Sequence, residues 1–263
     1  MILDYGTQIS FEPIKLAVGT IKKPTLRVIS KISFAKFQLF ESILRLKPQD
    51  FFENDKIDNS IKEFWNKLTD EEKSKVTTYT ILLIDEQIAI LFTEAFDFFF
   101  EEDVSFEENI FILRKQGKIV GYVDENIFMP VVETIQQICG IYEMKRSDLP
   151  EITFKNKGAE RLFERILKGK KKFKKQKEKE NKNNKDYTLP NIISAVANRH
   201  PSLNYTNIFD ITIFQLLDAF QRIYNNEVQD ISARSVSVWG DEKKKFDGSL
   251  WHKNIYDKDD IFI

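Results

Sequence analysis

The sequence predicts an α+β protein that is mainly α-helical, with N-terminal strands and one β-hairpin beside helices, and a small helical C-terminal piece after a Lys-rich linker. Apolar residues make up 42% of the 263 residues, which is enough to bury a core. Most of them recur at three- and four-residue steps, as in amphipathic helices. One turn, Lys115-Gln116-Gly117, separates two apolar segments and indicates the hairpin.

The first elements are predicted from composition and prolines. Ile2–Tyr5 and Ile14–Ile21 are apolar and rich in β-branched residues, so we expect residues 1–22 to be extended. A helix is expected from Pro24 to about Leu46, and Pro48 closes it. Its apolar positions are spaced helically and include Leu26, Ile29, Phe37, Phe40 and Leu44.

Helices and the hairpin are expected over the next part. A short helix is expected over residues 58–67, and Thr69 followed by three acids is typical of a helix start. The segment Tyr79–Phe100 is apolar nearly all round and predicts a helix buried on most sides, with a strand near Thr77–Ile84 as an open alternative.

The hairpin strands are expected at Ile110–Leu113 and Lys118–Val123. Asp124 or Asn126 then caps a helix that passes through Pro130 and stops at Gly140.

The C-terminal part reads as helices with a modest core. Ala159–Leu167 is an amphipathic helix that runs into lysines, and residues 188–200 form the next helix. The segment Asn207–Tyr224 has the clearest helical spacing, whereas Ile231–Trp239 is compatible with helix or strand. We expect so small a piece to rest on a partner or on the first domain.

Charge is distributed unevenly along the chain. The formal net charge is −1, but residues 168–185 hold ten lysines and two acids, so this stretch carries +8 and the rest −9. Such a stretch cannot bury enough surface to offset the entropy of ordering. It therefore predicts three parts: a mainly helical domain with a small β component over 1–167, a linker over 168–185, and a helical domain over 186–263.

The lysine-rich stretch is also a candidate contact for a polyanion, because lysines neutralise phosphates. We prefer the linker interpretation, since the stretch has one aromatic residue and no Arg for stacking or bidentate recognition. The candidate residues are Lys170, Lys171, Lys172, Lys174 and Lys175.

Acids without any base gather at residues 94–108. They are Glu94, Asp97, Glu101, Glu102, Asp103, Glu107 and Glu108. Oxygen ligands suit Ca²⁺ and Mg²⁺, but a calcium loop needs a central Gly that this stretch lacks. We interpret it as a solvated helix end and loop.

No motif in the sequence points to catalysis. The chain has two histidines, His200 and His252, and one cysteine, Cys139, so neither a Cys-based zinc module nor a disulfide scaffold can form. No His-Glu-x-x-His, Gly-x-Ser-x-Gly or phosphate-binding loop occurs. We expect no enzymatic activity, catalytic residue, metal or cofactor, a structural or capping role for the histidines, and a core position for Cys139.

The first ten residues, MILDYGTQIS, show no basic region followed by an apolar stretch, and no segment approaches 18 uncharged apolar residues. We therefore expect a cytoplasmic protein without a membrane segment.

Four stretches of the sequence have a familiar pattern: Asn191-Ile-Ile-Ser-Ala-Val-Ala-Asn-Arg-His, Val238-Trp-Gly-Asp, Gly19-Thr-Ile-Lys-Lys-Pro and Asp124-Glu-Asn-Ile-Phe. They resemble stretches of tail assembly chaperones of tailed phages that infect Gram-positive bacteria. The resemblance implies a non-enzymatic protein of the host cytoplasm that coats the tape measure protein and keeps it soluble. Its motifs are helix starts and turns, so they carry no active site.

The leading hypothesis is thus a chaperone whose apolar grooves hold amphipathic helices of the tape measure protein or of other tail proteins. The alternatives are a structural tail or baseplate protein that stays in the virion, and a nucleic-acid-associated factor that uses the lysines. Self-association is left open. The candidate contact residues, for which a plain core position is the favoured alternative, are Phe98, Phe99, Phe100, Phe214, Leu217 and Phe220.

Overall fold

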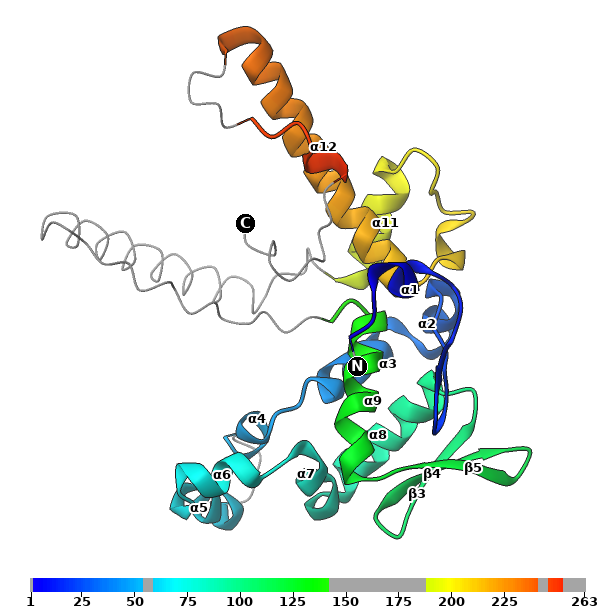
Figure 1. Ribbon diagram of the computed structural model, residues 1–263, viewed down its shortest axis with the longest axis vertical. Coiled ribbons are helices and arrows are strands. Elements are labelled where there is room, and N and C mark those ends of the chain that lie inside the picture. Colours follow the sequence, from blue (N-terminus) through cyan, green and yellow to red (C-terminus); the bar gives the residue numbers. More distant parts are fainter. Residues whose placement is uncertain (1, 54–58, 142–187, 241–245, 253–263) are drawn as a thin grey trace, which may run out of the picture. The chain divides into compact units, whose positions relative to one another are not determined.

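The computed structural model describes residues 2–53, 59–141, 188–240 and 246–252 (Figure 1). The chain divides into two compact units, one made of residues 1–142 and 196–263 and the other of residues 143–195. Almost all described elements belong to the first unit. It is mainly helical and contains two small antiparallel sheets, which confirms the predicted fold class.

The N-terminus begins with a short helix, so the prediction of an extended segment is wrong there. Helix α1 covers Tyr5–Ile9, because the Asp4 carboxylate accepts from the Thr7 backbone N–H at 2.8 Å and caps it. The expected strand over residues 14–21 is instead a tight hairpin of β1 (Ile14–Leu16) and β2 (Gly19–Ile21).

The helix expected from Pro24 to Leu46 is two helices. Helix α2 covers Leu26–Ile32 and α3 covers Phe34–Leu44. Ser33, with a φ of 78°, separates them, and its side chain accepts from the Lys36 N–H at 3.3 Å. A serine that caps the following helix competes with the helical backbone, which accounts for the break.

Three short helices follow, and the first two of them supply most of a small core. They are α4 (Pro48–Phe52), α5 (Asn59–Lys67) and α6 (Asp70–Lys75). The Phe52 ring stacks on Trp65 at 4.4 Å, and Ile81 completes the cluster. Thr69 and Glu72 form a reciprocal capping box at the start of α6, as the sequence predicts.

The apolar segment Tyr79–Phe100 also contains a break. Helix α7 covers Thr78–Ile84 and α8 covers Glu86–Phe99, and the Asp85 side chain between them caps α8. Thr78–Ile84 is therefore helical, with Thr77 as its cap, and the strand alternative is wrong.

The larger sheet has the order β3-β4-β5, with β3 at Asp103–Glu107, β4 at Ile110–Lys115 and β5 at Lys118–Val123. The β4–β5 hairpin around Gly117 confirms the prediction. Strand β3 lies where a loop was expected, because Val104 and Phe106 alternate with polar residues and pair with β4.

Helix α9 (Glu125–Ile138) starts at the Asp124 cap and continues through Pro130, as predicted. Its Phe128 ring lies 5.1 Å from Phe92 and 5.8 Å from Phe96, both on α8. Phe111 of β4 lies 4.8 Å from Phe96. These fully buried rings join the sheet to the two helices and form the centre of the core.

The C-terminal elements are α11 (Leu189–Arg199), η2 (Ile208–Asp210), α12 (Ile213–Trp239) and η3 (Leu250–His252). Residues 231–239 belong to α12 and are helical. The Leu26 N–H donates to the Ile211 carbonyl at 2.9 Å, and Thr25 forms a β-bridge with Thr212. Residues 208–222 thus rest on the N-terminal elements, as expected for a piece with little core.

The predicted helix at Ala159–Leu167 and the lysine-rich stretch at 168–185 lie outside the described residues. Within the described ranges, no helix combines the length and the apolar character needed to cross a membrane.

Candidate partner-binding surface on helix α12

The first turn of α12 is fixed by a capping box and by α1. The Thr212 N–H donates to Gln215 Oε1 at 3.0 Å, and the Gln215 N–H donates to Thr212 Oγ1 at 3.2 Å. The side-chain NH₂ of Gln215 also donates to the carbonyl of Ile9 at 2.7 Å. The start of α12 is therefore tied to the end of α1.

A second contact about one turn further along α12 involves a buried carboxylate. Asp218 is 6% exposed; the Tyr5 hydroxyl donates to its Oδ1 at 3.1 Å, and Arg222 Nε donates to both its oxygens at 3.2 Å. Burial raises the pKa of the Tyr5 hydroxyl above its ordinary value, so the hydroxyl keeps its proton and remains a donor at neutral pH. The proximal half of α12 is thereby held in place.

The distal half of α12 presents a row of exposed apolar side chains. Tyr224 is 61% exposed, Val228 36%, Ile231 68% and Val238 68%. With exposed Ser235 included, the steps between successive positions are four, three, four and three residues. This is the spacing of one helix face that pairs with another helix. We call these five residues the α12 stripe; at 1.5 Å per residue it is about 21 Å long.

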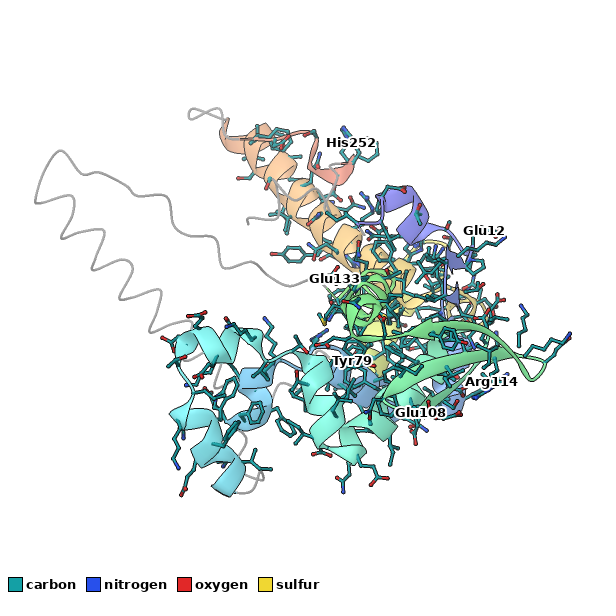
Figure 2. All side chains as sticks on the ribbon, turned by 60° about the horizontal axis from the view of Figure 1, so that its bottom comes forward. Glu12, Tyr79, Glu108, Arg114, Glu133 and His252 are labelled. Carbon is teal, nitrogen blue, oxygen red and sulfur yellow. The ribbon has the colours of Figure 1, made fainter. Side chains whose placement is uncertain are left out.

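A different face of the distal half is already covered within the chain. Gln229 Nε2 donates to the Gly248 carbonyl at 2.9 Å, and the Trp251 N–H donates to Gln229 Oε1 at 2.7 Å. Figure 1 shows this segment (red) lying along the orange part of α12. Gln229 follows Tyr224 by five residues, which places it about 140° around the helix from Tyr224. The segment 246–252 therefore leaves the stripe open. His252 is the last residue of that segment (Figure 2).

Two residues of opposite charge lie along one edge of the stripe. Glu227, whose side chain is 44% exposed, pairs with Arg199 Nε at 2.5 Å. Arg234 is exposed and stands seven residues, or two turns, after Glu227. Both residues immediately precede a stripe position, so they lie along the same edge of the stripe.

Phe98, Phe99 and Phe100 lie in the core at the end of α8. Phe99 and Phe100 are fully buried, and Phe98 is partly buried. The Phe98 ring lies 5.7 Å from Phe40 and 6.1 Å from Phe37, both on α3. Phe98 and Phe99 thus hold α8 against α3, whereas the Phe100 ring packs on Phe96 of α8.

The three candidates on α12 belong to its proximal half. Phe214 is fully buried, with its ring 6.2 Å from Tyr5, and Leu217 and Phe220 are partly buried. A Cβ placed on Gly140 would lie 2.9 Å from Leu217, so Leu217 packs closely on the end of α9. The five candidate lysines from Lys170 to Lys175 lie outside the described residues.

The α12 stripe was not predicted from the sequence, although the sequence contains a signal for it. Continuing from Leu217 and Phe220 in steps of three and four residues reaches Tyr224, Val228 and Ile231. The same face of the helix is thus buried at its base and exposed further along. Spacing alone predicts which residues share a helix face, whereas the exposure of that face depends on how the rest of the chain packs against it.

Several of the acids of residues 94–108 make contacts that stabilise the fold. Glu102 is 5% exposed and accepts from the Thr20 N–H at 2.9 Å. Arg114, labelled in Figure 2, donates to both carboxylate oxygens of Glu107, at 2.8 and 2.9 Å. These bonds, with one from Ser105, lower the pKa of Glu107 to about 2. Among the described residues, no group of His, Cys, Asp and Glu is arranged to hold a metal ion.

His200 and Cys139 occupy the structural positions predicted for them. His200 Nδ1 accepts from the backbone N–H groups of Ser202 and Leu203, at 3.2 and 3.1 Å, and so caps the turn after α11. Cys139 is fully buried, and this burial, followed by the charge of nearby Glu41, raises the pKa of its thiol well above the ordinary value. A protonated, buried thiol is unreactive.

Residues 175–256 match a protein family described as YomV second domain. The name YomV is that of a Bacillus prophage protein, so the match is consistent with a phage protein. The matched residues include α11 and all of α12, and hence the whole α12 stripe. No curated protein and no solved structure matches the chain.

Proposed function

We propose that this chain is a non-enzymatic phage protein that binds an amphipathic helix of the tape measure protein during tail assembly, with the α12 stripe as its binding surface. The observation that carries the proposal is the row of apolar side chains at four- and three-residue steps on an exposed helix face. The family match over the same residues supports a phage origin.

The binding mode follows from the spacing of the stripe. Residues at alternating steps of three and four return to the same face every 3.5 residues on average, and a second amphipathic helix can pack along that face. Each fully buried Ile or Val side chain contributes about 1.5–3 kcal/mol. Ile231 is 68% exposed in the isolated chain and so has the most to gain from such a contact.

The chemistry of a chaperone needs no reacting group. Apolar faces of long helices associate with one another when they are left exposed in water. A chain can cover such a face with its own apolar stripe. If its remaining surface is charged, it keeps the bound helix soluble until another protein takes its place on that helix. The −9 charge outside residues 168–185 supplies that solubility.

Co-expression with the tape measure protein of the same phage tests this function. The proposal predicts that the tape measure protein moves from the insoluble to the soluble fraction and co-purifies with this chain. If the tape measure protein remains insoluble and no complex is recovered, the proposal is contradicted.

Mass spectrometry of purified virions separates this function from a permanent place in the tail. A protein that acts only in assembly is absent from finished particles. Its presence there in fixed proportion to tail proteins would assign it to the tail or baseplate structure.

A further inference from the structure

We propose that, before a partner helix binds, the α12 stripe of one chain is covered by the α12 stripe of a second copy that runs in the opposite direction. The self-pairing stands on the geometry of α12 alone. Its replacement by a partner helix rests on the function proposed above. The stripe would thus be occupied in turn by a second copy and by the partner.

The sizes of the stripe residues are complementary when two copies run antiparallel. Placing Val228 against Ile231 of the second copy also places Ile231 against Val228 of that copy. In the same register, Tyr224, the largest stripe residue, lies opposite Ser235, the smallest. A parallel pair would instead place Tyr224 against Tyr224 and Ser235 against Ser235, which leaves one layer crowded and one poorly filled.

The charges beside the stripe favour the same direction. In an antiparallel pair, residues on the same edge of the two stripes face each other, so Glu227 lies near Arg234 of the second copy, and the reverse. Arg199 already pairs with Glu227 within the chain, but the Glu227 side chain is 44% exposed and its carboxylate can accept further donors. In a parallel pair, Glu227 faces Ser232 and gains no charge partner.

The stripe is also continuous with an interface that already exists inside the chain. The face that carries Leu217 and Phe220 packs on the N-terminal elements, and the same face carries the stripe further along. The 246–252 segment covers another side of the helix. A second helix can therefore lie along the stripe without displacing any described segment.

The length of the stripe predicts that this pairing is weak. About four helical turns on each chain bury less area than the roughly 1,600 Å² of a standard protein–protein interface. We therefore expect a reversible dimer whose proportion rises over about 1–100 μM chain. A weak pair is one that a longer partner helix can replace.

Charge reversal tests the side-chain pairing. Arg234→Glu places an acid opposite Glu227 of the second copy and is expected to lower the dimer fraction. Arg234→Lys keeps the charge and is expected to leave most of the dimer. Equal dimer fractions for the two variants would contradict the predicted position of Arg234.

Disulfide formation in the full-length chain tests the pairing and its direction. In an antiparallel pair, only the double variant Val228→Cys/Ile231→Cys brings cysteines of two copies face to face, because each single variant faces the native residue of the other position. The native chain is the control, since its only cysteine, Cys139, is fully buried. Helical content by circular dichroism checks that each variant folds.

Mild oxidation is expected to convert most of the double variant to a covalent dimer of twice 31.0 kDa, and little of either single variant. Covalent dimers of the single variants would indicate parallel pairing and overturn the proposal. A chain that sediments as a monomer at 100 μM and forms no covalent dimer would also overturn it. Because these experiments use the chain alone, they are independent of whether the tape measure protein binds.

Discussion

The hydroxyl of Tyr5 donates a hydrogen bond to Asp218 Oδ1 at 3.1 Å, across 213 positions of the sequence. Arg222 holds the same carboxylate and also donates to the Tyr5 hydroxyl at 3.2 Å. This three-residue contact joins α1 to the proximal half of α12. It fixes the buried base of the helix whose distal half carries the α12 stripe.

Tyr5→Phe removes the hydroxyl and leaves Asp218 with Arg222 as its remaining partner in this contact. A buried hydrogen bond contributes about 1 kcal/mol, so we expect the free energy of unfolding to fall by about 1 kcal/mol. Urea unfolding followed by circular dichroism measures it. Tyr122→Phe, at a tyrosine that is 49% exposed, is the matched control and should change stability little. An equal effect of both substitutions would show that the contact contributes nothing.

The Glu107–Arg114 ion pair should make the free energy of unfolding depend on pH in the acidic range. The pKa of Glu107 is about 2 in the folded chain and near 4.5 ordinarily, so the folded state favours the ionised carboxylate. Its contribution is therefore full above about pH 4.5 and is lost as the pH falls towards 2. Glu107→Gln should be less stable than the native chain at pH 7, and the difference should vanish near pH 2. Because the pair is exposed to solvent, the effect is small and salt weakens it. A difference that stays constant with pH would contradict this account.

Gly121 is required where the β1–β2 turn approaches β5. A Cβ at this position would lie 2.0 Å from the backbone carbonyl oxygen of Val18, and backbone cannot rotate away as a side chain can. We expect Gly121→Ala to lower the free energy of unfolding by about 1–3 kcal/mol or more. Gly248→Ala is the control, because its nearest contact would be at 3.6 Å. Thermal unfolding compares them, and a fully stable Gly121→Ala would show that the close approach is not needed.

The sequence predicts best those helices whose first turn is capped by the side chain of a nearby residue. Thr69 and Asp124 each cap a helix with their own side chains, and such signals depend on three or four neighbouring residues. The cap at Thr212 was not predicted, and the helix expected from Asn207 begins at Ile213 instead. The breaks at Ser33 and Asp85 were missed because the apolar spacing continues across them. In both cases a polar side chain caps the next helix, which spacing alone does not reveal.

Strand β3 was missed for a different reason. Its alternation of Val104 and Phe106 with polar residues is a strand pattern, but the surrounding acids suggested a solvated loop. Pairing with β4 and the ion pair between Glu107 and Arg114 accommodate those acids in the sheet. Tertiary pairing thus outweighed composition.

The candidate surface shows the limit of spacing as a guide to function. Phe99, Phe100 and Phe214 are candidate contact residues from the sequence, yet all three are fully buried. The α12 stripe has the same spacing and is exposed, because the described parts of the chain cover the base of the helix and the side that carries Gln229 but not the stripe. Exposure comes from long-range packing, which a local pattern does not contain.

Binding of the tape measure protein to two matched variants tests the central claim most directly. Ile231→Lys changes the stripe, whereas Ile90→Lys changes an isoleucine of similar exposure, 50% against 68%, on helix α8. The affinity should be measured by titration calorimetry below the concentration at which the chain pairs with itself. The account predicts at least about tenfold weaker binding for Ile231→Lys, because burying an isoleucine contributes 1.5–3 kcal/mol and about 1.4 kcal/mol is tenfold. It predicts native affinity for Ile90→Lys. Equal affinities for the two variants would contradict the assignment of the α12 stripe as the binding surface.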